Sequence, residues 1–252
     1  MPLITDALIL RENNQIGEAD RFVTALTRER GLLRASAKGA RKLKSRNAAA
    51  TQLLSYSRLT LIEGRDKYII TEAEPLHVFF DLRSDIEKLS LAQYFCEIAG
   101  VLVPREEPAE EPLRLLLNAL HFLGAGTRPA PLVKAVTELR LLMRAGYSPD
   151  LSSCRRCGGP AEEGAFLLPV RGTLRCCRCG GEPGAVPVSP AVLAALRHIL
   201  RAPLEKCFQF SLPEAELRGL AETTETFLLA QLNRGFRTLE FYHTLALRAG
   251  NT

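Results

Sequence analysis

Five of the chain's seven cysteines fall within residues 154–179, and four of these five form two matching pairs. Cys154 and Cys157 are separated by two residues and followed by Gly-Gly, and Cys176 and Cys179 repeat this pattern after 18 intervening residues. Zinc prefers four ligands at tetrahedral corners, and two C-x2-C turns supply them. The spacing therefore predicts one structural Zn²⁺ held by four thiolates, with no open coordination position for catalysis.

The fifth cysteine of this segment, Cys177, leaves open whether it replaces Cys176 as a ligand. Disulfides or idle thiols are the alternatives to a metal, but an odd cysteine count and an N-terminus without a secretory pattern favour a reducing cytoplasm. Four thiolates around Zn²⁺ leave an excess of negative charge. The arginines placed to offset it are Arg155, Arg156, Arg175 and Arg178.

A second segment, residues 27–46, is strongly basic. It holds eight Lys and Arg residues against the single acidic Glu29, although the net charge of the whole chain is only +5. A solvated charged loop is the ordinary interpretation of a charge run, but the near absence of carboxylates here favours nucleic acid. We expect a strand-turn-strand that ends in a flexible tail at residues 38–42. The predicted DNA-binding residues are Arg28, Arg30, Arg34, Lys38, Arg41, Lys42, Lys44 and Arg46.

Motifs for enzymatic catalysis are absent from the sequence. There is no G-x4-G-K-[ST] phosphate loop, no G-x-S-x-G elbow and no H-E-x-x-H. Asp6, Asp20 and Asp66 could gather around a metal for phosphodiester cleavage, but their spacing matches no known pattern. We therefore predict a protein without catalytic residues.

The elements that position the basic segment lie in the first 80 residues. Five short runs there are rich in β-branched or apolar residues, and a polar connector at 63–67 predicts a hairpin between the last two. Five such strands fit a small barrel of the oligonucleotide-binding (OB) type, with an SH3-like barrel as the alternative. The predicted strands are residues 6–11, 22–28, 32–37, 57–63 and 68–74.

From residue 81 the apolar period becomes helical. Gly146 is placed as a helix C-terminal cap, Ser189-Pro190 is a helix start, and the acidic connector 106–112 is expected to be a solvated loop. The predicted helices cover residues 89–102, 113–123, 132–143, 190–201, 213–232 and 237–248.

The predicted fold is therefore α+β and multidomain. A five-stranded OB-type barrel at 1–80 is followed by an α-helical domain at 81–150 and 185–252, which carries a four-cysteine zinc-binding insertion at 151–184. No apolar run approaches the roughly 20 residues that a membrane span needs, so no membrane association is expected.

Three short runs together resemble the N-terminal signature of the bacterial recombination mediator RecO family. They are Gly17-Glu18-Ala19-Asp20-Arg21, Thr27-Arg28-Glu29-Arg30-Gly31 and Lys38-Gly39-Ala40-Arg41. Gly146-Tyr147-Ser148-Pro149, leading into Cys154-Arg155-Arg156-Cys157, resembles the family's entry to its zinc motif, and the resemblance extends over essentially the whole chain.

The resemblance implies a non-enzymatic mediator of DNA repair and recombination in the bacterial cytoplasm, associated with the nucleoid. Such proteins bind single- and double-stranded DNA without sequence specificity and anneal complementary strands. Their partners are RecR, often RecF, and the C-terminal tail of single-strand-binding protein, and they assist RecA loading. The family's zinc ligands correspond to Cys154, Cys157, Cys176 and Cys179.

The third predicted helix could bind a partner protein. The tail of single-strand-binding protein is acidic with an apolar tip, and residues 132–143 offer cations beside leucines, although a core stripe is the ordinary interpretation. The residues concerned are Lys134, Leu139, Arg140, Leu142 and Arg144. A rival function is that of a zinc-ribbon scaffold in transcription or RNA metabolism, which explains the cysteines and the basic loop equally well.

Overall fold

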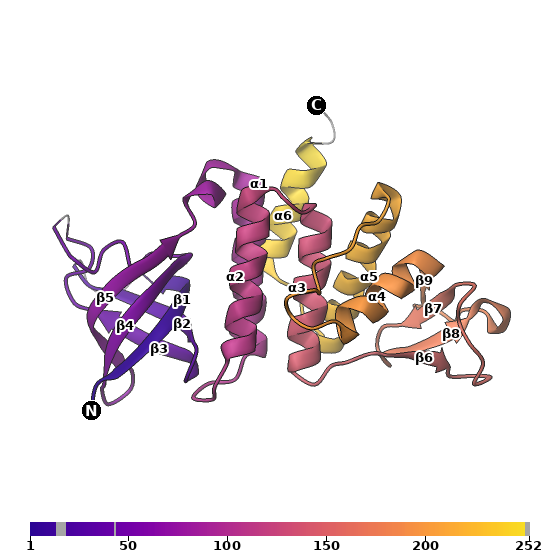
Figure 1. Cartoon of the computed structure of the whole chain (residues 1–252), viewed down its shortest axis with the longest axis horizontal. Helices are drawn as coiled ribbons and strands as arrows, with labels where there is room; N and C mark the ends of the chain where they lie inside the picture. Colours follow the sequence, from indigo (N-terminus) through magenta and orange to yellow (C-terminus); the bar gives the residue numbers. More distant parts are fainter. Residues whose placement is uncertain (14–18, 43, 250–252) are drawn as a thin grey trace. The chain divides into compact units, whose positions relative to one another are not determined.

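The computed structural model describes all residues except 14–18, 43 and 250–252, so Gly17 and Glu18 of the N-terminal signature lie outside the described residues. The chain divides into two compact units (Figure 1). The first comprises Met1–Ala125 with the end of the chain from Leu245, and the second comprises Gly126–Thr244.

The first unit begins with a closed five-stranded barrel in the order β1-β2-β3-β5-β4. All strand pairs are antiparallel except β3 with β5, which is parallel, and this arrangement confirms the OB-type barrel. Gly64 N–H donates to Lys67 O at 3.0 Å and closes the predicted hairpin. The strands are β1 (Leu3–Asn13), β2 (Arg21–Thr27), β3 (Gly31–Ala37), β4 (Ser55–Glu63) and β5 (Tyr68–Val78).

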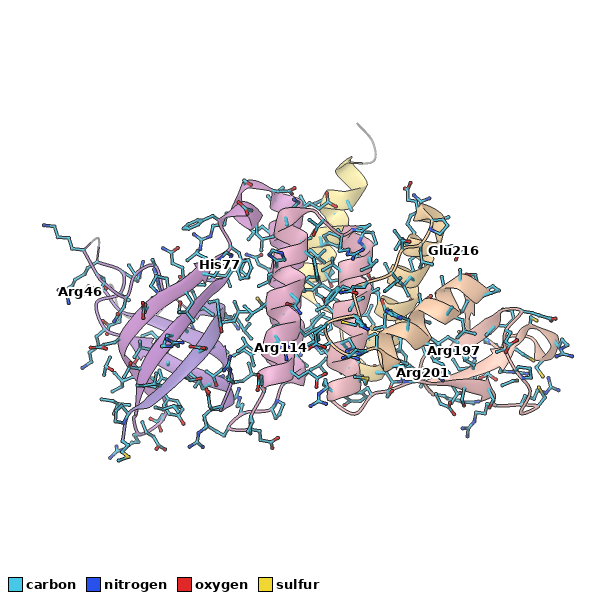
Figure 2. The ribbon with its side chains drawn as sticks, in the orientation of Figure 1. Arg46, His77, Arg114, Arg197, Arg201 and Glu216 are labelled. Atoms are coloured by element: carbon cyan, nitrogen blue, oxygen red, sulfur yellow. The ribbon has the colours of Figure 1, made fainter. Side chains whose placement is uncertain are left out.

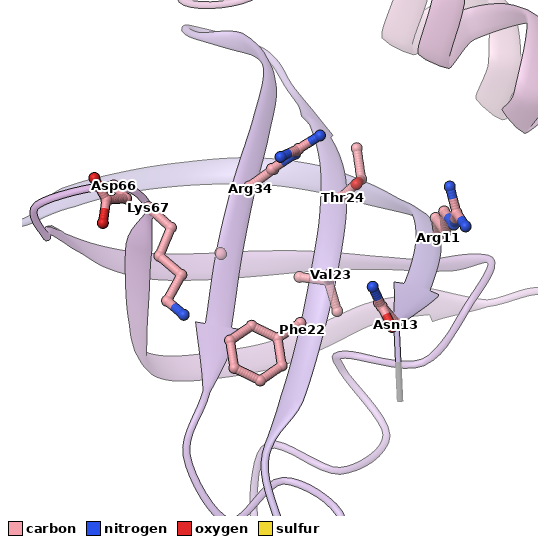
Figure 3. Close-up of a pocket in the computed structure, with 9 residues that line it drawn as sticks. Arg11, Asn13, Phe22, Val23, Thr24, Arg34, Asp66 and Lys67 are labelled. Carbon is pink, nitrogen blue, oxygen red and sulfur yellow. The ribbon is translucent and has the colours of Figure 1, made fainter. Parts of the chain in front are cut away.

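Alternation along the strands separates the barrel core from its outer face, because successive side chains of a strand point to opposite sides. Val23 and Ala25 of β2 belong to the buried core cluster, whereas Phe22 and Thr24 lie on the other face. The helices α1 (Ile86–Leu102) and α2 (Glu110–Ala125) contact β1, and α2 also contacts β2. The outer face of β2 and β3 contains a groove whose lining includes Phe22 and Thr24 (Figure 3).

The segment between α1 and α2 binds the β2–β3 turn through backbone hydrogen bonds. Leu32 N–H donates to Pro104 O at 3.1 Å, and Ala109 N–H donates to Arg28 O at 2.9 Å. Gly31, at φ 54°, lies so close that a Cβ there would be 2.5 Å from Pro104 O. The prediction that 106–112 is a loop is wrong from Glu110 onward, because α2 begins there with acidic residues in its first turn, where the helix dipole favours them.

The second unit combines four helices with a four-stranded sheet of order β6-β8-β7-β9. The strands are β6 (Asp150–Cys154), β7 (Ala165–Leu168), β8 (Thr173–Cys176) and β9 (Val186–Val188), and the helices are α3 (Ala130–Arg144), α4 (Pro190–Arg201), α5 (Glu214–Leu232) and α6 (Arg237–Ala249), whose last residues belong to the first unit. None of the helices in the described part of the chain is long and apolar enough to cross a membrane.

Both predicted helix caps of this unit are confirmed. Gly146, at φ 90°, donates its N–H to Met143 O at 3.1 Å, and Tyr147 N–H donates to Leu142 O at 2.9 Å, which together form a Schellman motif. Ser189 accepts a hydrogen bond from Val192 N–H as the N-cap of α4.

A buried ion network joins α3, α5 and α6. Lys134 Nζ lies 2.8 Å from Glu138 Oε1 and 2.8 Å from Glu225 Oε2, and His243 Nε2 lies 2.9 Å from Glu225 Oε1. The side chain of Lys134 is 3% exposed and that of Glu138 is fully buried. Such a network fixes helix packing, because removing one member leaves a buried charge without compensation.

This network predicts a loss of stability in acid. Burial would raise the pKa of Glu225, but the ammonium of Lys134 and the imidazole of His243 together outweigh burial and hold the pKa below the ordinary 4.5. A folded-state pKa below the unfolded value stabilises the protein above about pH 4.5, and this contribution disappears as the pH falls through the folded pKa. In thermal unfolding scans, we expect Glu225→Gln to lower stability by about 1–3 kcal/mol near neutrality and to flatten the acid dependence.

The matched control is Glu214→Gln, because Glu214 pairs with Arg218 at 2.8 Å but both side chains are more than half exposed. An exposed pair contributes at most about 1 kcal/mol. If both variants lost the same amount of unfolding free energy, the buried network would contribute no more to stability than an exposed ion pair.

Candidate nucleic-acid interface and metal centre

The four predicted zinc ligands lie together in space. The sulfur atoms of Cys154, Cys157, Cys176 and Cys179 are all within 4.8 Å of one another, and Cys157 Sγ lies 3.8 Å from Cys176 Sγ. Four sulfurs at about 2.3 Å from a tetrahedral Zn²⁺ are roughly 3.8 Å apart. The cluster can therefore hold one metal ion with all-thiolate coordination.

The turns that hold these cysteines are built alike. Gly158 N–H donates to Cys154 O at 2.8 Å and Gly180 N–H donates to Cys176 O at 3.2 Å. Both glycines have φ near 70°, a left-handed conformation that disfavours a Cβ. The two C-x2-C-G turns thus curl in the same way and direct their sulfurs to one point.

Backbone donors favour the thiolate form that a metal requires. The N–H of Cys176, and then those of Cys157 and Arg156, lower the pKa of the Cys154 thiol to about 6. Hydrogen bonds with the thiols of Cys157 and Cys176 raise the pKa of Cys179 to about 12. The backbone around Cys154 therefore favours the thiolate form of this cysteine.

Two of the four predicted arginines approach the cluster, and both donate to the same carbonyl. Arg156 Nη1 lies 3.3 Å and Arg175 Nη2 lies 3.2 Å from Cys179 O. Cys177 is exposed and its Sγ lies 3.9 Å from Glu163, outside the four-sulfur set. The cluster therefore contains Cys176 rather than Cys177.

The eight predicted cations are all exposed, but they do not form one group. Arg30 precedes β3 and Lys38 follows it, so at roughly 3.3 Å per strand residue they are on the order of 25 Å apart. Arg34 lies between them on the outer face of β3, and Arg28, at the β2–β3 turn, is 3.9 Å from Asp6. The remaining four are in the β3–β4 connection, where Figure 2 shows Arg46 extending away from the barrel.

The described residues of the β3–β4 connection are fixed by contacts with the barrel, whereas a flexible tail was predicted at 38–42. Ala40 is fully buried in the barrel core. Arg41 N–H donates to Ala19 O at 3.0 Å, and Lys42 N–H donates to Gly39 O at 3.1 Å. The exposed cations of this connection are therefore held on a folded backbone.

A groove of about 370 Å³ on the outer face of the barrel contains functional candidates that sequence reasoning missed (Figure 3). Of its lining residues, only Arg34 was among the predicted DNA-binding cations. Lys67 Nζ lies 4.1 Å from the centroid of the Phe22 ring, so a cation and a half-exposed aromatic ring stand together. The lining is Arg11, Asn13, Phe22, Val23, Thr24, Arg34, Ala35, Asp66 and Lys67.

The groove was missed because its residues are scattered along the sequence. Arg11 ends the apolar part of β1 and Lys67 belongs to a hairpin connector, and neither lies in a charge run. They meet because Asn13 pairs with Phe22 and Ala35 pairs with Tyr68 in the barrel.

The interpretation of α3 as a groove for an acidic tail is wrong, because four of its five residues are in the core and only Arg144 is exposed. Lys134 is 2% exposed and belongs to the ion network. Arg140 is 5% exposed and donates to Ile199 O at 3.1 Å and to Ala202 O at 3.0 Å. Leu139 and Leu142 are buried as well, so the ordinary interpretation, a core stripe, is confirmed.

The three aspartates that could have held a catalytic metal are used separately. Asp6 accepts from Arg58 Nε at 3.0 Å, Asp20 accepts from Gly39 N–H at 2.8 Å, and Asp66 lines the groove. Among the described residues, the four cysteines are the one group found with metal-binding geometry.

Fold and site together define a class of protein: an OB-type barrel with exposed cations, followed by a helical part that carries four cysteines able to hold a metal ion. Comparison with known families identifies the particular one. The family model described as "Recombination protein O N terminal" matches residues 1–79, and "Recombination protein O C terminal" matches residues 83–240. The chain belongs to the RecO family.

Individual relatives agree with this assignment. The "DNA repair protein RecO" of Acetivibrio thermocellus is 32% identical over 244 residues, which cover 96% of this chain and 97% of the relative. That of Symbiobacterium thermophilum is 34% identical over 95% of this chain and 96% of the relative. That of Heliobacterium modesticaldum is 42% identical over 77% of this chain and 72% of the relative.

Proposed function

We propose that this protein is a non-enzymatic mediator of DNA repair and recombination that binds single- and double-stranded DNA through its barrel and anneals complementary strands. The observation that supports this most is the combination, on one OB-type barrel, of an ordered cationic loop with an open groove. Membership of a family whose curated relatives are named DNA repair proteins supports the same conclusion.

The two surfaces suit different parts of a DNA strand. Arg41, Lys42, Lys44 and Arg46 offer cations for phosphates, and the basic segment that contains them has no aromatic residue, which favours binding independent of sequence. The groove adds Phe22, whose ring can stack on a base that is free of a partner strand. Single strands would therefore use both surfaces, whereas a duplex would use mainly the loop.

Annealing follows from electrostatics. Two complementary strands repel each other, and a surface that neutralises phosphates on both lowers this repulsion and raises their local concentration. Base pairing then supplies the specificity. No group on the protein needs to react, which is consistent with the absence of catalytic motifs from the sequence.

The proposed partners follow from the family. We propose RecR, the C-terminal tail of single-strand-binding protein, and in some settings RecF, with RecA loading onto coated single strands as the outcome in the bacterial cytoplasm and at the nucleoid. For the metal centre we propose Zn²⁺, because four thiolates with tetrahedral spacing suit zinc. It would act as a structural brace for the β6–β9 sheet.

The proposal is tested with labelled complementary strands coated by single-strand-binding protein, with and without the tail of that protein. We expect annealing to require this protein and to slow when the tail is absent. If about four cations each neutralise one phosphate, single-strand affinity should fall roughly 50-fold between 50 and 200 mM salt. Incubation with Mg²⁺ or Mn²⁺ should leave labelled DNA uncut.

A variant without charge change tests the groove. Phe22→Ala is expected to weaken single-strand binding about 10-fold, while duplex binding and the salt dependence stay as in the wild type. An affinity for single strands that does not depend on salt, or no annealing of coated strands, would contradict the proposal.

A further inference from the structure

Residues 38–54 connect β3 and β4. This connection contains five of the eight predicted DNA-binding cations, namely Lys38, Arg41, Lys42, Lys44 and Arg46. Apart from residue 43, which lies outside the described part, it has neither helix nor strand. Loops of this length without secondary structure are uncommon in compact domains and are usually functional or disordered. The described residues of this loop are held by hydrogen bonds with the barrel and by buried side chains.

The first anchor is at the start of the loop. Asp20 Oδ1 accepts a hydrogen bond from Gly39 N–H at 2.8 Å, and Arg41 N–H donates to Ala19 O at 3.0 Å. Ala40, between these two bonds, is fully buried in the barrel core. Lys38 and Arg41 therefore flank a fixed point and are both exposed.

The second anchor is Arg21, a buried cation on the first residue of β2. Its Nη1 donates to Ala48 O at 2.6 Å and to Thr51 Oγ1 at 2.9 Å. Its Nε lies 3.3 Å from Glu12 Oε2, and the other oxygen of Glu12 accepts from Leu53 N–H. A buried guanidinium is tolerated only with such compensation, so these contacts specify one loop conformation.

The end of the loop is tied to the barrel by further side chains. Ser55 Oγ donates to Ala49 O at 2.8 Å, and Ala73 N–H donates to Asn47 Oδ1 at 3.1 Å. Leu54, at φ 62° and 1% exposed, adopts a left-handed conformation that persists only where the surroundings enforce it. The loop is thus held at its start, middle and end.

We propose that Asp20 and Arg21, with Glu12, are positioning residues that preorganise the β3–β4 loop for the DNA backbone. Arg21 is 9% exposed and its guanidinium is committed to the loop, so it acts through the loop rather than on phosphate. A loop that is already ordered loses little conformational entropy when it binds, and therefore binds more tightly than a mobile loop with the same charges. This inference rests on the proposed function for its DNA part, but not for the order of the loop.

The experiment compares three variants with the same change of charge. Asp20→Ala removes the acceptor for Gly39 N–H, and Asp20→Asn keeps an acceptor oxygen. Glu214→Gln removes an exposed carboxylate on α5 that belongs neither to the loop nor to the lining of the groove. Electrostatics alone would make all three bind DNA slightly more tightly, because each loses a negative charge. Only the loss of the anchor predicts weaker binding.

For Asp20→Ala, we expect amide hydrogen exchange at Gly39 and Arg41, and trypsin cleavage after the loop cations, to accelerate at least about 10-fold. Single-strand affinity should fall about 5-fold with an unchanged salt slope, because the phosphate contacts themselves remain. Asp20→Asn and Glu214→Gln should match the wild type in loop protection and lose no affinity. Arg21→Met is expected to act like Asp20→Ala, and if it fails to fold, the aspartate series decides.

Unchanged loop protection in Asp20→Ala overturns the inference, as does a loosened loop with full DNA affinity. Weakened binding in Glu214→Gln equal to that in Asp20→Ala also overturns it. The proposed function fails in a different way, namely if reversal of the charges at Arg41 and Lys42 leaves DNA binding unchanged while the loop stays ordered.

Discussion

Replacing both Arg41 and Lys42 with glutamate is expected to weaken single-strand binding on the order of 10- to 100-fold at 0.2 M salt. Each cation on a phosphate contributes a factor of roughly three at this salt concentration, and reversal adds repulsion to the lost contacts. Both side chains are exposed, on a backbone fixed by Arg41 N–H to Ala19 O, so the fold should be preserved. Titration of a labelled oligonucleotide over a salt series measures the affinity and the slope.

The salt dependence of binding shows whether phosphate contacts have been lost. Two lost phosphate contacts should lower the slope of log K against log salt by about 1.4. Arg201→Glu is a matched control, because this exposed cation lies on α4, outside the barrel, and should leave the slope unchanged. If both variants bind as the wild type does, the β3–β4 loop has no part in DNA binding.

Replacing Cys154 with serine is expected to abolish metal binding and to unfold the β6–β9 sheet. In small zinc-dependent peptides, binding of structural zinc contributes about 10–16 kcal/mol to the free energy of folding. The β6–β9 sheet has only short strands of three to five residues, so we expect it to depend on the metal in the same way. Zinc content per chain should fall from one to near zero. Circular dichroism and hydrogen exchange over residues 150–188 should report the loss of the sheet.

Cys177→Ser is the matched control, because Cys177 neighbours two ligands in sequence but its exposed thiol lies outside the four-sulfur cluster. It should retain one zinc and the stability of the wild type. Single-strand binding should survive in both variants, since the proposed contacts are in the barrel. Zinc retained in Cys154→Ser, or lost in Cys177→Ser, would contradict the assignment of ligands.

Local signals in the sequence were sufficient for the barrel strands, for most helices and for the cysteine cluster, but not for the short strands β6–β9. The barrel strands, the Gly146 and Ser189 caps and the cysteine repeat all depend on residues close together in the chain, so period and spacing predict them. The start of α2 was misplaced because acidic residues and a proline are equally common in loops and in the first turn of a helix.

The sequence by itself determined that cations gather before residue 47 and that four thiols can meet around one metal. Only the tertiary structure decided which cations lie together, that the loop is ordered by the buried Arg21, and that Arg11, Phe22 and Lys67 share a groove. It also showed that Lys134 and Arg140 of α3 are buried. The physical reason is that charge and spacing are local properties, whereas burial and contact depend on strand register and on helix packing between residues distant in sequence.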